Sequence, residues 1–280
     1  MADRNERIRI FEQTMEICRN DSDLCLAIHD SRAKQKITWE EEQLVVSGEW
    51  REVPADLVIT PERTLEAARK YTEKGKRVCV LNFASSVTPG GGVTRGAGAQ
   101  EESMCRVSTL YAAISDKETA GFFYERHWQM IQSGEMNRKN RDDCIFTPGI
   151  TVIRKDTFDC AMLPKDQWYN VDVITCAAPD LRYDGDNTYH PSEAELKAVF
   201  EKRWTRILSV AALNKADVLI LGAFGCGAFY NPPEIAAQAF SNVFAEFASL
   251  FEVVEFAIFT QNEYDRNYLV FSRMKEILER

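Results

Sequence analysis

The chain has 280 residues, 45% of them hydrophobic, and carries a formal net charge of −9 at pH 7. This length allows one large hydrophobic core or two small ones, and the apolar content is ordinary for a soluble globular protein. No apolar run approaches the ~20 residues of a membrane helix, and the charged start lacks an apolar signal region, so we expect a cytoplasmic protein without membrane contact. The acidic net charge argues against DNA-specific binding.

The first 55 residues give the least regular pattern. Apolar residues at helical spacing predict a helix over residues 3–19. The short apolar run of residues 24–29 predicts a strand, and residues 34–51 are consistent with either a hairpin or irregular structure. We expect residues 1–55 to form an N-terminal extension packed on a catalytic domain of residues 56–280, the two making one structural unit.

From Asp56 onward, strands and helices alternate. The predicted strands are 57–59, 77–83, 144–147, 151–154, 171–178, 217–222 and 253–259. The predicted helices are 61–74 with Thr60 as its cap, 103–115, 122–132, 192–214 with Ser192 as its cap, 234–250 and 265–279. Residues 148–149 are expected to turn the chain between two short strands. This alternation predicts an α/β sandwich with a largely parallel sheet, whose ligands bind beyond the carboxyl ends of the strands.

Two glycine-rich segments follow predicted strands. The first contains Gly90, Gly91 and Gly92, and Gln100, Glu101 and Glu102 then open a helix. The second is the segment 222–233, GAFGCGAFYNPP. Glycines at the end of a strand allow backbone N–H groups to approach a ligand closely, most often a phosphate. Paired acids beside such a loop suggest proton chemistry on a nucleotide-like ligand.

The first segment, with its Pro-Gly-Gly-Gly, seven-residue spacer and Gln-Glu-Glu, resembles the signature of the poly(ADP-ribose) glycohydrolases, which belong to the macrodomains. The start Asn82-Phe83-Ala84 is similar to the compact bacterial-type form, and the second segment resembles the second phosphate loop of the family. The resemblance covers most of the chain beyond about residue 56. It implies a macrodomain-like three-layer α/β/α sandwich with a mixed, largely parallel sheet, here with an N-terminal helical extension.

The resemblance also implies the site residues. It makes Glu102 the catalytic acid and Glu101 the residue that orients the ribose and supports the site. Ligand contacts fall on Asn82, Ser85, Gly90, Gly91, Gly92, Gln100, Gly225, Cys226, Gly227, Ala228 and Phe229. Ser85 stands where the family often has Asn after the Phe-Ala pair. Tyr230 and the residues near Asn231 are candidates for stacking on adenine.

The expected activity is hydrolysis of the ribose–ribose O-glycosidic bonds of poly(ADP-ribose), mainly from the free end, with ADP-ribose as product. The alternatives are a mono-ADP-ribosyl hydrolase acting on ADP-ribosylated proteins and a non-catalytic ADP-ribose-binding macrodomain, although the double acid argues against the latter. A nucleotide-binding oxidoreductase fits poorly, because no G-x-G-x-x-G opens a first βαβ unit. The three histidines and eight cysteines lack metal-ligand spacing, and we expect no metal, no cofactor and reduced, buried thiols.

Overall fold

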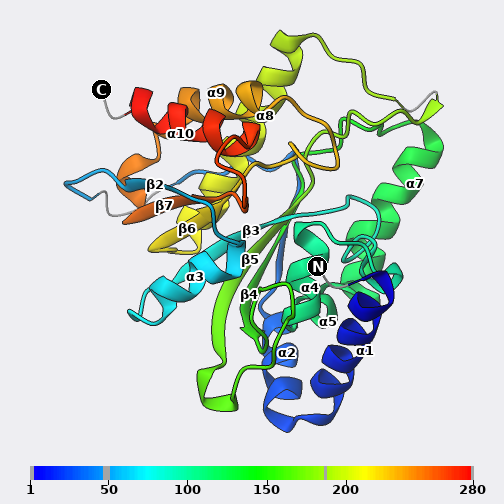
Figure 1. The fold of residues 1–280 in the computed structure, drawn as a ribbon. Coiled ribbons are helices and arrows are strands. Elements are labelled where there is room, and N and C mark those ends of the chain that lie inside the picture. The colour runs from blue at the N-terminus through cyan, green and yellow to red at the C-terminus, as the bar shows by residue number, and fades with distance from the viewer. Residues whose placement is uncertain (1–2, 47–50, 186–187, 279–280) are drawn as a thin grey trace.

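The computed structural model describes residues 3–46, 51–185 and 188–278, and a seven-stranded sheet forms its centre (Figure 1). The strands are β1 (Lys36–Thr38), β2 (Asp56–Thr60), β3 (Val78–Phe83), β4 (Cys144–Val152), β5 (Tyr169–Cys176), β6 (Val218–Leu221) and β7 (Val253–Ala257). Their order across the sheet is β1-β4-β5-β3-β6-β7-β2. The five strands from β5 to β2 in this order are parallel, whereas β4 runs antiparallel to both β5 and β1.

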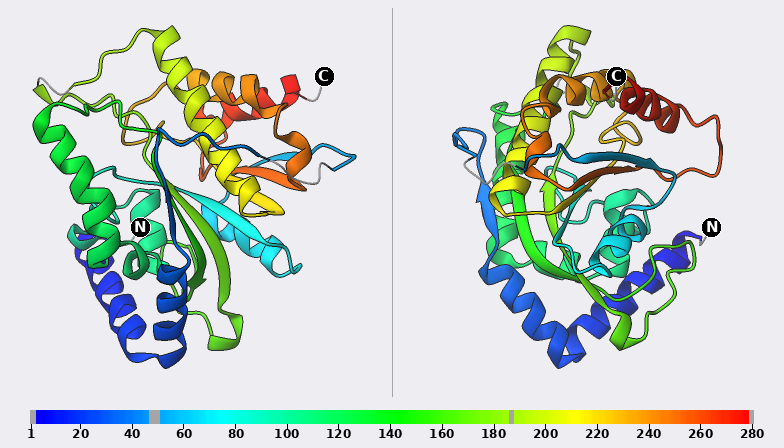
Figure 2. Two further views of the ribbon diagram at one scale, coloured as in Figure 1. Left: turned by 180° about the vertical axis from the view of Figure 1, so that it is seen from behind. Right: turned by 90° about the vertical axis from the view of Figure 1, so that its left-hand side faces the viewer.

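Helices cover both faces of the sheet (Figures 1 and 2). They are α1 (Arg4–Asn20), α2 (Ser22–Ala33), α3 (Thr64–Thr72), α4 (Gln100–Val107), α5 (Leu110–Ile114), α6 (Lys117–Thr119), α7 (Arg126–Ser133), α8 (Glu193–Leu213), α9 (Pro233–Phe244) and α10 (Arg266–Leu278). Short turns of 3-10 or π type lie at η1 (Val93–Arg95), η2 (Ala120–Glu125), η3 (Lys165–Gln167) and η5 (Ala248–Leu250). This arrangement confirms the predicted three-layer α/β/α sandwich with an N-terminal helical extension.

The central strands separate two apolar cores. In β3, Cys79 and Leu81 face the core beneath α8, α9 and α10, whereas Val78 and Val80 face the core beneath α1 to α5. β6 alternates in the same way. Successive side chains of a strand point to opposite faces, so a strand buried on both faces reads as a continuous apolar run.

Four local predictions were wrong. Residues 24–29 are helical within α2, because Asp21 caps that helix by accepting from the N–H groups of Asp23 and Leu24. Residues 144–152 form one strand, β4, not a hairpin; its register against β5 shifts between Thr147 and Ile150. Helix α3 begins at residue 64, because Thr60 still pairs with β7. The predicted helix 103–115 is two helices, α4 and α5, because residue 108 bridges to β4.

The N-terminal segment is joined to the rest of the chain through the sheet. Strand β1 pairs with β4, and α1 contacts α4 and η1. Residues 47–50 and 279, which fall within predicted segments, lie outside the described residues. Within the described part of the chain, no helix is both long enough and apolar enough to cross a membrane.

Candidate active site

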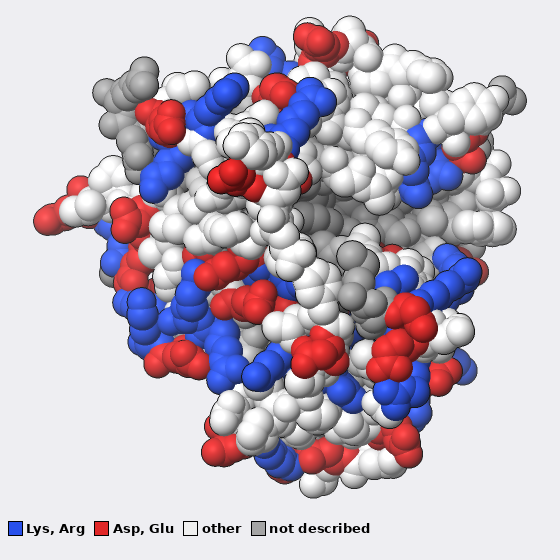
Figure 3. Space-filling view, viewed as in Figure 1, with Lys and Arg blue, Asp and Glu red and all other residues white. Residues whose placement is uncertain are grey.

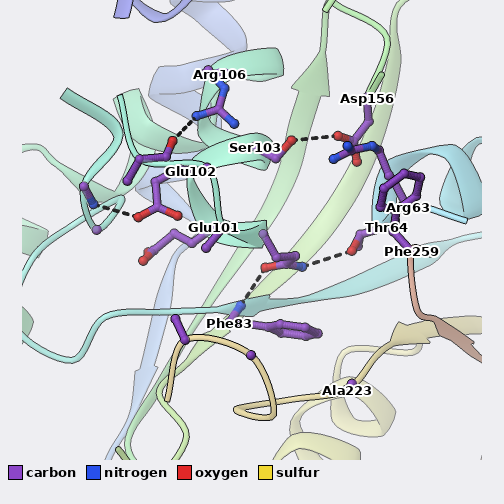
Figure 4. Close-up of a pocket in the computed structure, with 18 of the residues that line it drawn as sticks. Arg63, Thr64, Phe83, Glu101, Glu102, Ser103, Arg106, Asp156, Ala223 and Phe259 are labelled. Carbon is purple, nitrogen blue, oxygen red and sulfur yellow. Dashed lines mark hydrogen bonds between the residues drawn. The ribbon is translucent and has the colours of Figure 1, made fainter. Parts of the chain in front are cut away.

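A pocket of about 850 Å³ lies beyond the carboxyl ends of the central strands. Both glycine-rich segments line it, together with the first turn of α4, the loop 156–160 and the segments that follow β2 and β7. Figure 4 shows the acids of α4 on one side of this pocket and Ala223 of the second glycine loop on the other. The two segments that are far apart in the sequence therefore meet where ligands bind in sheets of this kind.

Glu102 lines the pocket and is 8% exposed. Its Oε1 accepts a hydrogen bond of 2.8 Å from the backbone N–H of Gly92. Its Oε2 is buried and has no hydrogen-bond partner among the described residues. One oxygen thus fixes the carboxyl, and the other has no partner among the described residues.

Glu101 is held more tightly and lies deeper. Its Oε2 accepts from the N–H of Ser85 at 2.8 Å, and its Oε1 accepts from the Asn82 amide at 3.3 Å. Burial raises the pKa of Glu101 to about 8, and the neighbouring Glu102 adds to the rise, although the N–H donors of Ser85, Asn82 and Gly90 counteract it.

Gly91 allows the two carboxyl groups to converge. Its φ of +56° lies in the left-handed region. A Cβ at this position would lie 2.6 Å from Oε1 of Glu102 and 2.9 Å from Oε2 of Glu101. A side chain there would displace both carboxyl groups, so the first glycine loop is shaped around the two acids.

The remaining member of the Gln-Glu-Glu motif ties α4 to the sheet. Oε1 of Gln100 accepts from the N–H of Phe83 at 2.9 Å, and its Nε2 donates to the carbonyl of Leu81 at 2.8 Å and to the Thr64 hydroxyl at 3.1 Å. These contacts, two of which appear in Figure 4, use both ends of the amide. Gln100 borders the pocket, and its contacts within the protein fix the start of the acid-bearing helix.

The second glycine loop presents backbone N–H groups. Those of Gly227 and Ala228 donate to no acceptor among the described residues, and both residues line the pocket. Gly225 has a φ of +75°, and a Cβ there would lie 2.6 Å from the Ala178 side chain. The Asn231 amide closes this loop by donating to the carbonyls of Gly225 and Pro179 at 2.9 and 2.7 Å. Such a loop suits an anion bound through the backbone.

Three of the predicted contact residues do not line the pocket. Asn82 is buried behind Glu101, and a Cβ on Gly90 would meet the Tyr111 ring instead of the pocket. Cys226 packs against the core, and burial raises the pKa of its thiol to about 12, so it is not a nucleophile. The predicted residues that do line the pocket are Ser85, Gly91, Gly92, Gln100, Glu101, Glu102, Gly225, Gly227, Ala228 and Phe229.

The predicted candidates for adenine stacking lie apart from the pocket lining. Tyr230 is 71% exposed and lies outside the pocket lining, and Asn231 is used within its own loop. An aromatic cluster at another part of the pocket wall was missed: the Arg63 guanidinium lies 4.6 Å from the Phe158 ring centre and 4.1 Å from that of Phe259. These three residues come from separate segments, so no local pattern in the sequence could have indicated the cluster.

Two further polar groups were not predicted. Asp156 accepts from the Ser103 hydroxyl at 2.9 Å and from the N–H of Leu65 at 3.2 Å, and burial raises the pKa of this carboxyl. Arg182 donates to both carboxylate oxygens of Asp180 and lies 4.8 Å from the Phe229 ring centre. Among the described residues, no group of three or more His, Cys, Asp or Glu side chains could hold a metal ion.

Known proteins resemble this chain in sequence and in fold. Residues 5–155 match the family model of the microbial-type poly(ADP-ribose) glycohydrolase (PARG) catalytic domain. PARG from Thermomonospora curvata superposes with a TM-score of 0.83 at 28% identity, covering 96% of this chain and 99% of that one. The same enzyme bound to the inhibitor ADP-HPD gives 0.82 at 28% identity, with the same coverage. PARG from Deinococcus radiodurans in complex with ADP-ribose gives 0.74 at 27% identity, covering 90% of this chain and 97% of that one.

No curated protein matches the sequence. The family model nevertheless spans more than half of the chain, and it includes the first glycine loop and the paired acids. The chain belongs to the microbial-type PARG catalytic-domain family.

Proposed function

We propose that this protein hydrolyses the ribose–ribose O-glycosidic bonds of poly(ADP-ribose) and releases ADP-ribose. The observation that carries the proposal is the arrangement of Glu102, whose Oε1 is anchored on Gly92 while Oε2 is left without a partner at the pocket. The likeness to PARG structures that hold ADP-ribose or ADP-HPD supports the same assignment.

The chemistry follows from the two acids. Glu102 donates a proton to the leaving ribose oxygen as the glycosidic bond breaks and positive charge develops at the anomeric carbon. The ionised Glu102 then takes a proton from the water that attacks this carbon, which restores the acid. Glu101, held by Ser85 and Asn82, orients the ribose.

The second glycine loop supplies the phosphate contacts in this proposal. The N–H groups of Gly227 and Ala228 hold the diphosphate of the terminal unit, and Phe229 packs against the distal ribose. Backbone donors need no net positive charge, which is consistent with an acidic protein acting on a polyanion.

Cleavage from the free end is part of the proposal. Phe229, with Arg182 over its ring, forms a bulky wall beside the second loop that hinders passage of a continuing polymer. The last unit on a protein offers an amino-acid side chain as its leaving group and should resist. We further propose that the chain acts as one structural unit of macrodomain type, with residues 1–55 packed on residues 56–280, in the cytoplasm and without DNA-specific binding.

The decisive experiment compares two substrates. The protein is incubated separately with automodified poly(ADP-ribosyl)ated protein and with mono(ADP-ribosyl)ated protein, and the products are separated by chromatography. We expect monomeric ADP-ribose from the polymer and little release from the mono-modified protein. Abundant oligomers at low conversion would contradict cleavage from the free end. Efficient release of the last unit would favour a mono-ADP-ribosyl hydrolase, and binding without release would favour a non-catalytic macrodomain.

A further inference from the structure

Three arginines border the pocket close to Glu102, and the mechanism above does not use them. Arg7 comes from α1, Arg95 from η1 and Arg106 from the last turn of α4. In Figure 4, Arg106 lies on the far side of Glu102 from Ala223 of the second glycine loop. Arg106 therefore belongs to the part of the wall opposite the proposed diphosphate loop.

The small residues between η1 and α4 bring these guanidinium groups together. Arg106 Nη1 donates to the carbonyl of Ala97 at 2.7 Å, because a long helical side chain points back toward the start of its helix. The Arg7 guanidinium carbon lies 3.6 Å from the position of a Cβ on Gly98. Both guanidinium groups thus lie against the segment of residues 97–98.

Arg95 and Glu102 both lie close to Gly92. A Cβ on Gly92 would lie 3.8 Å from Nη2 of Arg95 and 3.5 Å from Oε1 of Glu102. Gly92 is also the residue whose N–H anchors that acid. The same glycine therefore borders both groups.

Helix α1 holds this part of the wall in place. Nε of Arg4 donates to the carbonyl of Arg95 at 2.7 Å, and Nε of Arg7 donates to the carbonyl of Gly96 at 2.7 Å. Gly96 has a φ of +72°, and a Cβ there would collide with the backbone of Arg4. The loop and the helix are thus fitted to each other, which gives the N-terminal helix a part in building the site.

Neither Arg95 nor Arg106 forms an ion pair with a carboxylate among the described residues, and Nε of the buried Arg106 has no hydrogen-bond partner there. The other two arginines of the pocket have partners within the protein. The Arg63 guanidinium lies over two aromatic rings, and Arg182 donates hydrogen bonds to Asp180. On the face shown in Figure 3, Lys and Arg lie in small groups among Asp and Glu and form no continuous basic surface. On this face, the positive partners available to a polyanion are therefore local groups.

We propose that Arg7, Arg95 and Arg106 form a subsite for the diphosphate of the departing ADP-ribose unit, the one whose ribose oxygen Glu102 protonates. This inference rests on the proposed function. The leaving oxygen belongs to the adenosine ribose of that unit, and the diphosphate follows directly on the same ribose, so it lies near the acid. Guanidinium groups match phosphate oxygens in charge and in planar geometry. The subsite would favour polymer over mono-ADP-ribosylated targets, which lack this diphosphate.

Binding to a catalytically disabled protein tests the subsite directly. In the Glu102→Gln background, Arg95→Gln is made alone and together with Arg7→Gln. The Arg95 guanidinium makes no hydrogen bond to the described residues, so its removal leaves the packing intact. Arg9→Gln is the matched control, because Arg9 lies on the same helix, pairs with Glu6 and is outside the pocket. Thermal unfolding of each variant verifies folding.

Dissociation constants are measured for labelled poly(ADP-ribose) of defined length and for free ADP-ribose at several salt concentrations. We expect the double variant to bind polymer about tenfold more weakly and ADP-ribose within about twofold of the parent. The slope of log affinity against log salt for the polymer should fall by about 0.7 for each arginine removed. Arg95→Lys should restore the slope, and Arg9→Gln should change nothing.

The subsite is overturned if the polymer and ADP-ribose affinities fall together, if neither changes, or if the parent does not bind polymer. Turnover of polymer by the unaltered enzyme is measured in parallel. Absence of that turnover counts against the proposed function, whereas normal turnover with unselective binding losses counts against the subsite alone.

Discussion

Replacing Gly91 with Ala should disable the site by displacing both acids. The new Cβ would lie 2.6 Å from Oε1 of Glu102 and 2.9 Å from Oε2 of Glu101, and ordinary contact begins at 3.4 Å. Oε1 must therefore retreat by about 0.8 Å, which breaks its hydrogen bond to Gly92, and a misplacement of this size costs about 10²-fold in rate. The left-handed φ adds about 1–2 kcal/mol of backbone strain to the folded state.

A matched substitution separates these two effects. Gly75 has a φ of +73° with no atom within 4 Å of a Cβ, and it lies outside the pocket. Gly75→Ala should lower the unfolding temperature by a few degrees, as Gly91→Ala does, without changing the rate. Single-turnover cleavage of poly(ADP-ribose) and thermal unfolding are measured for both variants. A folded Gly91→Ala protein that cleaves at the wild-type rate would refute the convergence of the two carboxyls as the basis of catalysis.

Four further predictions concern the same site. Glu102→Gln should lower the rate of polymer cleavage by about 10²–10⁴-fold while changing ADP-ribose affinity little, and near-normal turnover would exclude it as the acid. The folded pKa of Glu101, about 8, exceeds its ordinary value of 4.5, so the free energy of unfolding of the wild type should fall as pH rises from about 5 to 8. In urea unfolding, the Glu101→Gln variant, which cannot ionise here, should therefore become more stable relative to wild type across that range. A difference that stays constant with pH would contradict the raised pKa. A Cβ at Gly227 would meet no atom of the described residues within 4 Å, so Gly227→Val should preserve the unfolding temperature. Because the side chain would stand where the diphosphate is proposed to bind, calorimetry should find the affinity for ADP-ribose reduced. Chelation with EDTA should leave hydrolysis intact, and loss of activity that magnesium restores would contradict a carboxyl-only mechanism.

The sequence alone predicted the features that depend on local patterns. The alternation of apolar strands and helices predicted the layered fold, and Ser192 with Glu195 located the start of α8 through its capping box. The glycines after β3 and β6 and the acids of α4 located the pocket, because parallel strands carry their following loops to one edge of the sheet. These signals depend on the spacing of residues within one segment, which can be read from the sequence before the fold is known.

Tertiary structure decided what depends on partners distant in the sequence. Tertiary contacts distinguish the two acids. Glu102 accepts one hydrogen bond, from Gly92, and keeps one oxygen without a partner among the described residues, whereas both oxygens of Glu101 accept hydrogen bonds, from Ser85 and Asn82. The Arg63 cluster and the arginines near Glu102 also gather from separate segments. Residues 24–29 were assigned wrongly because a short apolar run suits a helix or a strand equally until its neighbours are known. Residues 144–152 were divided at an expected Pro-Gly turn, whereas the strand continues there and only its register against β5 shifts. The contacts that make a side chain exposed, anchored or charged are formed only when the chain folds, and these contacts determine the chemistry of the site.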